Sequence, residues 1–205
     1  MLGFENLKNL IFTSYAQKIT KDKTFYPYKI SLEYILSDYT LIKNRNLLEE
    51  LTKFISNFNE VVIKSNQVFS FCKIFDSSKP TNPILVHLVS SIIYQLALTC
   101  NVEIKERHHF KYDLYSDKNR LFPLGADADI DYGTKDLRFK NRYPFPVKLK
   151  LELSENKLRG EIVSKEKINY SEINFKKINH KNCIEIFTRV NKRTVAVSIY
   201  KLNSI

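Results

Sequence analysis

The sequence predicts an α+β fold in a single domain, with an antiparallel sheet, a buried central helix, one or two packed helices and C-terminal β-hairpins. Its 205 residues are enough for one domain with a substantial core. The apolar segment 84–99 has the length and composition of a buried helix. After residue 140, apolar and polar side chains alternate as they do in half-buried strands.

The N-terminal part predicts two helices separated by extended chain. Apolar positions in residues 5–19 have the spacing of a short amphipathic helix. Residues 20–31 are expected to form a loop that leads into a strand, and residues 34–42 to be extended. Asn46 is the expected N-cap of the next helix, because apolar residues recur at helical spacing over 47–58. This second helix is amphipathic and is expected to pack on the core.

The middle of the chain predicts two short strands, at 61–63 and 68–71, followed by a long helix. Asn82 and Pro83 mark the start of that helix, since proline suits the first helical position. Its apolar residues leave one narrow polar stripe, formed by His87, Ser90, Ser91 and Tyr94. We favour a buried helix whose small hydroxyls bond to preceding carbonyls while His87 meets one core partner. The alternative is a polar face that opens into a pocket.

The C-terminal part predicts two β-hairpins. Apolar and charged residues alternate over 147–153, and after a turn at 154–157 the segment 158–163 returns as the partner strand. Residues 183–187 and 194–200 form the second predicted hairpin. The alternation places lysines on the solvent side of the sheet.

The net charge of +11 is concentrated in residues 141–205, which carry fourteen basic and six acidic side chains. Such a surface attracts polyanions, namely nucleic acid, anionic lipid headgroups or phosphate-bearing wall polymers. A solvated, lysine-rich sheet face is the simpler interpretation.

The cysteines and the N-terminus predict a cytoplasmic protein with reduced thiols. Cys72, Cys100 and Cys183 form no CxxC pair, which argues against a disulfide framework and a structural zinc site. Residues 1–5 have no secretory signal pattern, and the longest apolar run is too short to span a bilayer, so no integral membrane segment is expected. No cofactor and no metal are expected.

Chemically capable side chains are densest between residues 103 and 141. Glu106, Arg107, His108 and His109 are consecutive, and a series of aspartates at alternate positions follows, formed by Asp127, Asp129 and Asp131. In an extended strand the three carboxylates would share one face and repel, so each should meet a cation, a metal or water. The spacing is similar to a calcium loop, but the glycine and distal glutamate of that loop are missing.

Two catalytic arrangements are open at this point. His108 or His109 would act as a general base with Asp136 as its acidic partner. Alternatively, a cysteine would act as a nucleophile beside a histidine, although buried cysteine is more often an apolar filler.

Four blocks of the sequence, in this order, resemble the VanW family. The blocks are Asn66-Gln67-Val68-Phe69-Ser70-Phe71, Glu103-Ile104-Lys105-Glu106-Arg107-His108-His109, Gly125-Ala126-Asp127-Ala128 and Lys135-Asp136-Leu137-Arg138-Phe139-Lys140-Asn141. The family is named for an accessory protein of B-type glycopeptide (vancomycin) resistance clusters. The resemblance implies a role in glycopeptide resistance or the bacterial cell envelope.

The chain departs from the family at two places. Lys64-Ser65-Asn66-Gln67 stands where the family has a proline-glycine-glutamate turn. His87 and Leu88 stand where the family has Cys-Gln after a glycine-rich segment. If the family cysteine is a nucleophile, this chain lacks it. Either the chain is a degenerate member kept for binding, or the cysteine of the family is not catalytic.

The resemblance divides the single domain 1–205 into an N-terminal extension (1–39), a family-like core (40–165) and a C-terminal β segment (166–205). The residues expected in its pocket are His87, Arg107, His108, His109, Asp127, Asp136, Arg138 and Asn141. The two arginines would grip a carboxylate or phosphate, and the alternative for them is a structural ion pair with Asp127 or Asp136.

Three functions follow from these observations. The first is a binding or accessory protein for an anionic cell-envelope ligand or a protein partner. The second is a hydrolase or transferase that uses His108 and His109. The third, nucleic-acid binding through the basic C-terminal third, is not favoured because no nucleic-acid-binding motif supports it.

Overall fold

The computed structural model describes residues 26–36, 45–56, 61–76, 80, 82–113, 122–154 and 157–202. The helix predicted for residues 5–19 and the extended segment beyond residue 36 lie outside these residues. The described helices are α1 (Arg45–Ser56), α2 (Phe71–Phe75) and α3 (Pro83–Thr99). The described strands are β1 (Tyr28–Ile35), β2 (Val61–Ile63), β3 (Val68–Ser70), β4 (Glu103–Glu106), β5 (Arg138–Lys140), β6 (Val147–Ser154), β7 (Lys157–Ser164), β8 (Ile173–Asn179), β9 (Cys183–Val190) and β10 (Arg193–Lys201).

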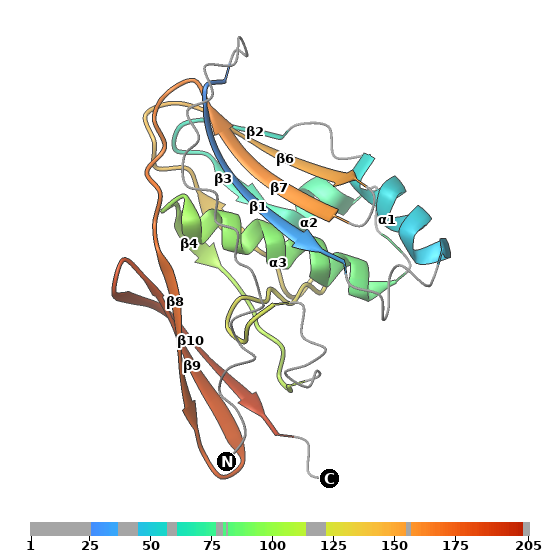
Figure 1. Ribbon diagram of the computed structural model, residues 1–205, viewed down its shortest axis with the longest axis vertical. Coiled ribbons are helices and arrows are strands. Elements are labelled where there is room, and N and C mark those ends of the chain that lie inside the picture. Colours follow the sequence, from blue (N-terminus) through green and yellow to red (C-terminus); the bar gives the residue numbers. More distant parts are fainter. Residues whose placement is uncertain are drawn as a thin grey trace.

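The predicted α+β class is confirmed. The strands form three sheets, in the orders β1-β7-β6-β2, β3-β5-β4 and β10-β9-β8, and every pairing is antiparallel. In Figure 1 helix α3 runs across one face of the four-stranded sheet, while the sheet of β8, β9 and β10 extends away from the rest of the molecule. The predicted hairpins are β6–β7 and β9–β10. The second turns through Asn191 and Lys192, both at positive φ, as a tight hairpin requires.

Helix α3 is the buried central helix. Asn82 caps it, accepting a hydrogen bond from the Ile84 amide at 2.9 Å, and Pro83 occupies the first turn, as predicted. The helix approaches β7 so closely that a Cβ on Gly160 would lie 2.7 Å from atoms of both Ile92 and Leu96. The glycine is therefore needed for this packing.

Several boundaries differ from the prediction. Helix α1 begins at Arg45, so Asn46 lies inside it and is not its N-cap. Strand β1 falls within the predicted N-terminal extension, yet it pairs with β7 along eight residues and is part of the core sheet. Within the described residues, no helix is both long and apolar enough to cross a bilayer.

Candidate functional site

The three-stranded sheet β3-β5-β4 brings together three segments that are far apart in the sequence. In its register Arg138 of β5 lies opposite Ser70 of β3 on one side and Glu106 of β4 on the other. These three side chains therefore form one row across the sheet. Each belongs to a block that carries the family resemblance.

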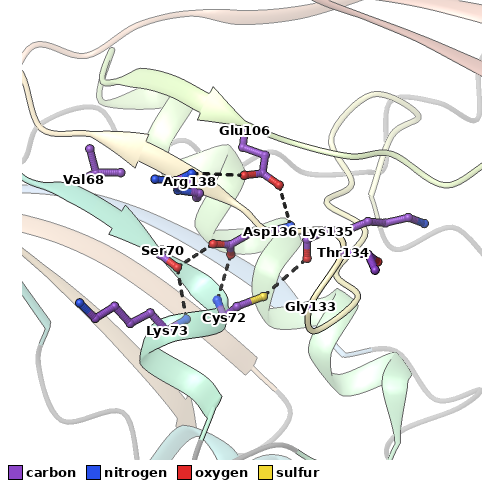
Figure 2. Close-up of a pocket in the computed structure, with 10 residues that line it drawn as sticks. All are labelled: Val68, Ser70, Cys72, Lys73, Glu106, Gly133, Thr134, Lys135, Asp136 and Arg138. Carbon is purple, nitrogen blue, oxygen red and sulfur yellow. Dashed lines mark hydrogen bonds and ion pairs between the residues drawn. The ribbon is translucent and has the colours of Figure 1, made fainter.

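This row opens into a pocket of about 500 Å³, which we call the β3–β5 pocket (Figure 2). The pocket is lined by Val68, Ser70, Cys72, Lys73, Glu106, Gly133, Thr134, Lys135, Asp136 and Arg138. In Figure 2, Lys73 and Arg138 lie on one side of Asp136, and Thr134 and Lys135 lie on the other. The lining thus carries three cations and two carboxylates.

Asp136 holds the start of helix α2. Its carboxylate accepts hydrogen bonds from Ser70 Oγ at 2.6 Å and from the Cys72 amide at 2.9 Å. Ser70 is the N-cap of α2 and accepts a bond from the Lys73 amide at 3.2 Å. This contact explains why Phe71 begins a helix, whereas the sequence predicted a strand through residue 71. The carboxylate of Asp136 has both oxygens engaged within the protein.

Glu106 is the second carboxylate of the pocket. It accepts a bond from the Asp136 amide at 3.0 Å, lies 3.0 Å from His108 Nε2, and lies 3.7 Å from the guanidinium of Arg138. Desolvation alone would raise its pKa, but the contacts with His108 and the Asp136 amide outweigh it, so the pKa of Glu106 lies below the ordinary glutamate value. Glu106 is therefore ionised and compensated at neutral pH.

The cations of the pocket are less fully engaged than its carboxylates. Arg138 is half exposed and meets Glu106 only at 3.7 Å. Lys135 pairs with Asp129. Among the described residues, none forms an ion pair with Lys73. The pocket therefore offers positive charge to a ligand on the side where Lys73 and Arg138 lie.

Arg107 points away from this pocket and forms a buried ion pair with Asp127. Its Nη2 lies 3.0 Å from Asp127 Oδ1, its Nε donates to the Asp127 carbonyl at 2.8 Å, and its Nη1 donates to Ser198 Oγ at 2.5 Å. Tyr200 donates to the same carboxylate, and the Phe110 amide donates to Oδ2 at 2.9 Å. Because Ser198 and Tyr200 belong to β10, this network joins the C-terminal sheet to the core.

His108 and His109 lie on opposite sides of the chain. His108 faces Glu106, whereas His109 Nδ1 lies 2.8 Å from the Phe110 carbonyl and its ring lies 5.1 Å from that of Tyr200. The two imidazoles do not form one catalytic cluster.

His87 lies in a third place, beside the aspartate segment. Its Nδ1 is 3.7 Å from Asp129 Oδ1, and its ring meets Phe110 edge-on. Burial lowers the pKa of His87. On the same stripe Ser90 donates to the Ala128 carbonyl at 2.7 Å, and Ser91 accepts from the Ala128 amide at 3.0 Å. The stripe therefore holds the segment around Ala128. The hydroxyl of Ser90 also donates to a preceding carbonyl, that of His87 at 3.2 Å, as expected, whereas the hydroxyl of Ser91 accepts a bond.

The three aspartates meet different partners. Asp127 pairs with Arg107, Asp129 pairs with Lys135, and Asp131 accepts a bond from the Thr134 hydroxyl. Within the described part of the chain, no group of His, Cys, Asp and Glu side chains is arranged to hold a metal ion.

Asn141 lies outside the pocket, where it holds together backbone segments that are distant in the sequence. Its amide nitrogen lies within 3.2 Å of three carbonyl oxygens, those of Ile63, Lys64 and Phe145. Its carbonyl oxygen accepts from the Tyr143 amide at 3.0 Å. The side chain is fully buried, so its contacts are structural.

The predicted residues thus do not converge in a single pocket, and that expectation was wrong. Asp136 and Arg138 line the β3–β5 pocket, and His108 is joined to it through Glu106. The other predicted residues lie elsewhere. Arg107 and Asp127 form the buried ion pair, His87 lies beside Asp129, His109 contacts the Phe110 carbonyl, and Asn141 holds the backbone near Phe145. The predicted pocket residues did not include Ser70, Lys73, Glu106 and Lys135, although Ser70, Glu106 and Lys135 stand in family-like blocks.

Residues 86–163 match the family model described as VanW like protein. The match confirms the predicted resemblance over this segment, which contains the pocket residues from Glu106 to Arg138. No curated protein and no solved structure matches the chain.

Proposed function

We propose that this protein, whose residues 86–163 are VanW-like, is a binding protein. Its role would be accessory to glycopeptide resistance or to another cell-envelope process. Its ligand is an envelope fragment that bears a carboxylate or a phosphate, and its site is the β3–β5 pocket. The arrangement of charge in that pocket carries the proposal.

The two carboxylates of the pocket are compensated from within, as Asp136 and Glu106 already accept hydrogen bonds from the protein. Arg138 and Lys73 keep donors that an anion can use. A planar guanidinium can bind a carboxylate or phosphate with two parallel hydrogen bonds, which fixes the orientation of the ligand as well as adding affinity.

The same contacts favour binding over catalysis. The hydroxyl of Ser70 donates to Asp136 and accepts from the Lys73 amide, so it caps a helix. The thiol of Cys72 donates to the Lys135 carbonyl at 3.5 Å. Among the described residues, no imidazole bonds to the Ser70 hydroxyl in the way that nucleophilic catalysis requires.

The test is a titration of the protein with a peptidoglycan stem peptide that has a free terminal carboxylate, and separately with inorganic phosphate. We expect saturable binding of at least one of them, and about a tenfold loss of affinity in Arg138→Gln and in Lys73→Gln, because each removes a charge-assisted hydrogen bond. Isothermal titration calorimetry measures both quantities.

Two controls separate the pocket from general charge attraction. Arg142→Gln removes a cation that is 65% exposed outside the pocket and pairs with Glu103, so affinity should not change. The stem peptide with an amidated terminus should bind weakly. Equal weakening by Arg142→Gln and Arg138→Gln, or equal binding of acid and amide, would contradict the proposal.

The catalytic alternative is favoured by one contact only, that of His108 with Glu106 at the wall of the pocket. In this alternative His108 is the general base and His109 has no part. It requires turnover of the stem peptide that His108→Ala abolishes and His109→Ala retains, as seen by mass spectrometry of the products.

A further inference from the structure

The C-terminal sheet has one face on the body of the protein and one face toward solvent. Ser198 and Tyr200 of β10 are buried on the inner face, as are Ile184 and Ile186 of β9. Figure 1 shows this sheet projecting from the rest of the fold. Among the described residues, those on the outer side of β10 are exposed along the strand.

The outer side of β10 carries three large aliphatic residues where polar side chains are expected. Val195, Val197 and Ile199 are 51%, 47% and 52% exposed. Val195 is the extra residue of a bulge between Thr194 and Ala196, and Val197 lies opposite Phe187 of β9. We call these three residues the aliphatic stripe. A run of exposed aliphatic side chains on one strand indicates a surface that binds a protein partner or a membrane.

Cations lie at both ends of the stripe. Residues 173–201 contain seven basic side chains and one acidic side chain. Lys192 and Arg193 are exposed at the turn end of β10, and Lys201 is exposed at its other end. The acidic residue, Glu185, lies 3.1 Å from His180 Nε2. Exposed aliphatic side chains and positive charge thus occur together on this sheet.

We propose that the aliphatic stripe and the cations at its ends dock this protein on an anionic membrane surface. The aliphatic side chains would enter the boundary between headgroups and acyl chains, and the lysines and arginines would face the lipid phosphates. Each cation near such a surface favours binding by about fivefold. The surface is separate from the β3–β5 pocket, and the proposal does not depend on the pocket's ligand.

Other occupants fit less well. A second copy of the chain would bring the same positive charge to the contact, which opposes association. Single-stranded nucleic acid is bound through aromatic side chains on which bases stack, whereas the stripe is aliphatic. Addition of a peptide strand to β10 is opposed by its bulge and by residues 111–113, whose backbone already bonds to Lys201.

The test is co-sedimentation with vesicles of equal parts phosphatidylcholine and phosphatidylglycerol, and with vesicles of phosphatidylcholine alone. We expect binding to the first and little to the second. Val197→Ser with Ile199→Ser should weaken binding about tenfold or more, because the apolar contact is lost. Lys192→Glu with Arg193→Glu should weaken it by a similar factor.

The matched control changes the same residue types at equal exposure elsewhere. Val62 and Ile35, on the two edge strands of the four-stranded sheet, are 45% and 59% exposed. Val62→Ser with Ile35→Ser should leave vesicle binding unchanged. Lys53→Glu with Lys64→Glu is the matched charge control, since both lysines are exposed. Circular dichroism of each variant checks that it is folded.

Three results would overturn the proposal. One is vesicle binding that the stripe variants do not reduce more than their controls. Another is tighter binding to an oligonucleotide than to the vesicles, lost in Lys192→Glu with Arg193→Glu. The third is a dimer in sedimentation velocity that the stripe variants dissociate.

Discussion

Replacing Arg107 with alanine is expected to lower the free energy of unfolding by about 3–5 kcal/mol, because it removes one partner of a buried ion pair. The side chain of Arg107 is 5% exposed and that of Asp127 is 10% exposed. Without the guanidinium, the carboxylate of Asp127 stays buried next to Tyr200 with no compensating charge. Urea unfolding followed by circular dichroism measures the loss.

The control is Arg142→Ala, which removes an exposed ion pair and should cost about 0–1 kcal/mol. Arg107 was expected from the sequence to contact a ligand. At its observed burial it should instead affect stability, and the folded fraction of an Arg107→Lys variant should retain affinity for the pocket's ligand. A stable Arg107→Ala protein that has lost only ligand binding would show that the pair is functional.

Replacing Asn141 with alanine is also expected to lower the free energy of unfolding strongly. It removes contacts to three backbone carbonyls and one backbone amide in a fully buried place. Each buried group left without a partner costs about 1–3 kcal/mol, but the Lys64 carbonyl keeps its bond from the Gln67 amide, so we expect a loss of about 3 kcal/mol. Thermal and urea unfolding both report it.

Asn174→Ala is the matched control for Asn141, since Asn174 is exposed on β8 and should change stability by about 0.5 kcal/mol or less. If Asn141→Ala and Asn174→Ala lowered the free energy of unfolding equally little, the turn near Phe145 would be held by something other than the Asn141 amide.

The elements with strong local signals were predictable from the sequence. Asn82 and Pro83 indicate the start of helix α3 from local sequence alone, and the strict alternation over 147–153 predicts strand β6. Helix α2 was missed because five residues give no helical period, and because its N-terminus depends on Asp136, which is distant in the sequence. Strand β8 was missed because its apolar residues do not alternate regularly.

The candidate site was predictable only in part. The sequence placed Glu106, Arg107, His108 and His109 together, but in an extended chain successive side chains point to opposite sides. Glu106 therefore lines the pocket and contacts His108, whereas Arg107 and His109 contact β10. Strand pairing between β3 and β5 brings Ser70 to Asp136, and no local pattern encodes that pairing.

In our proposal the β3–β5 pocket receives the ligand, and the buried Arg107 and Asn141 do not. Amide chemical shifts recorded while the stem peptide is added test it most directly. We expect shifts at Lys73, Thr134 and Arg138 that saturate together, with the amides of Arg107 and Asn141 unmoved. Saturating shifts at Arg107 and Asn141, with none at those three residues, would contradict it.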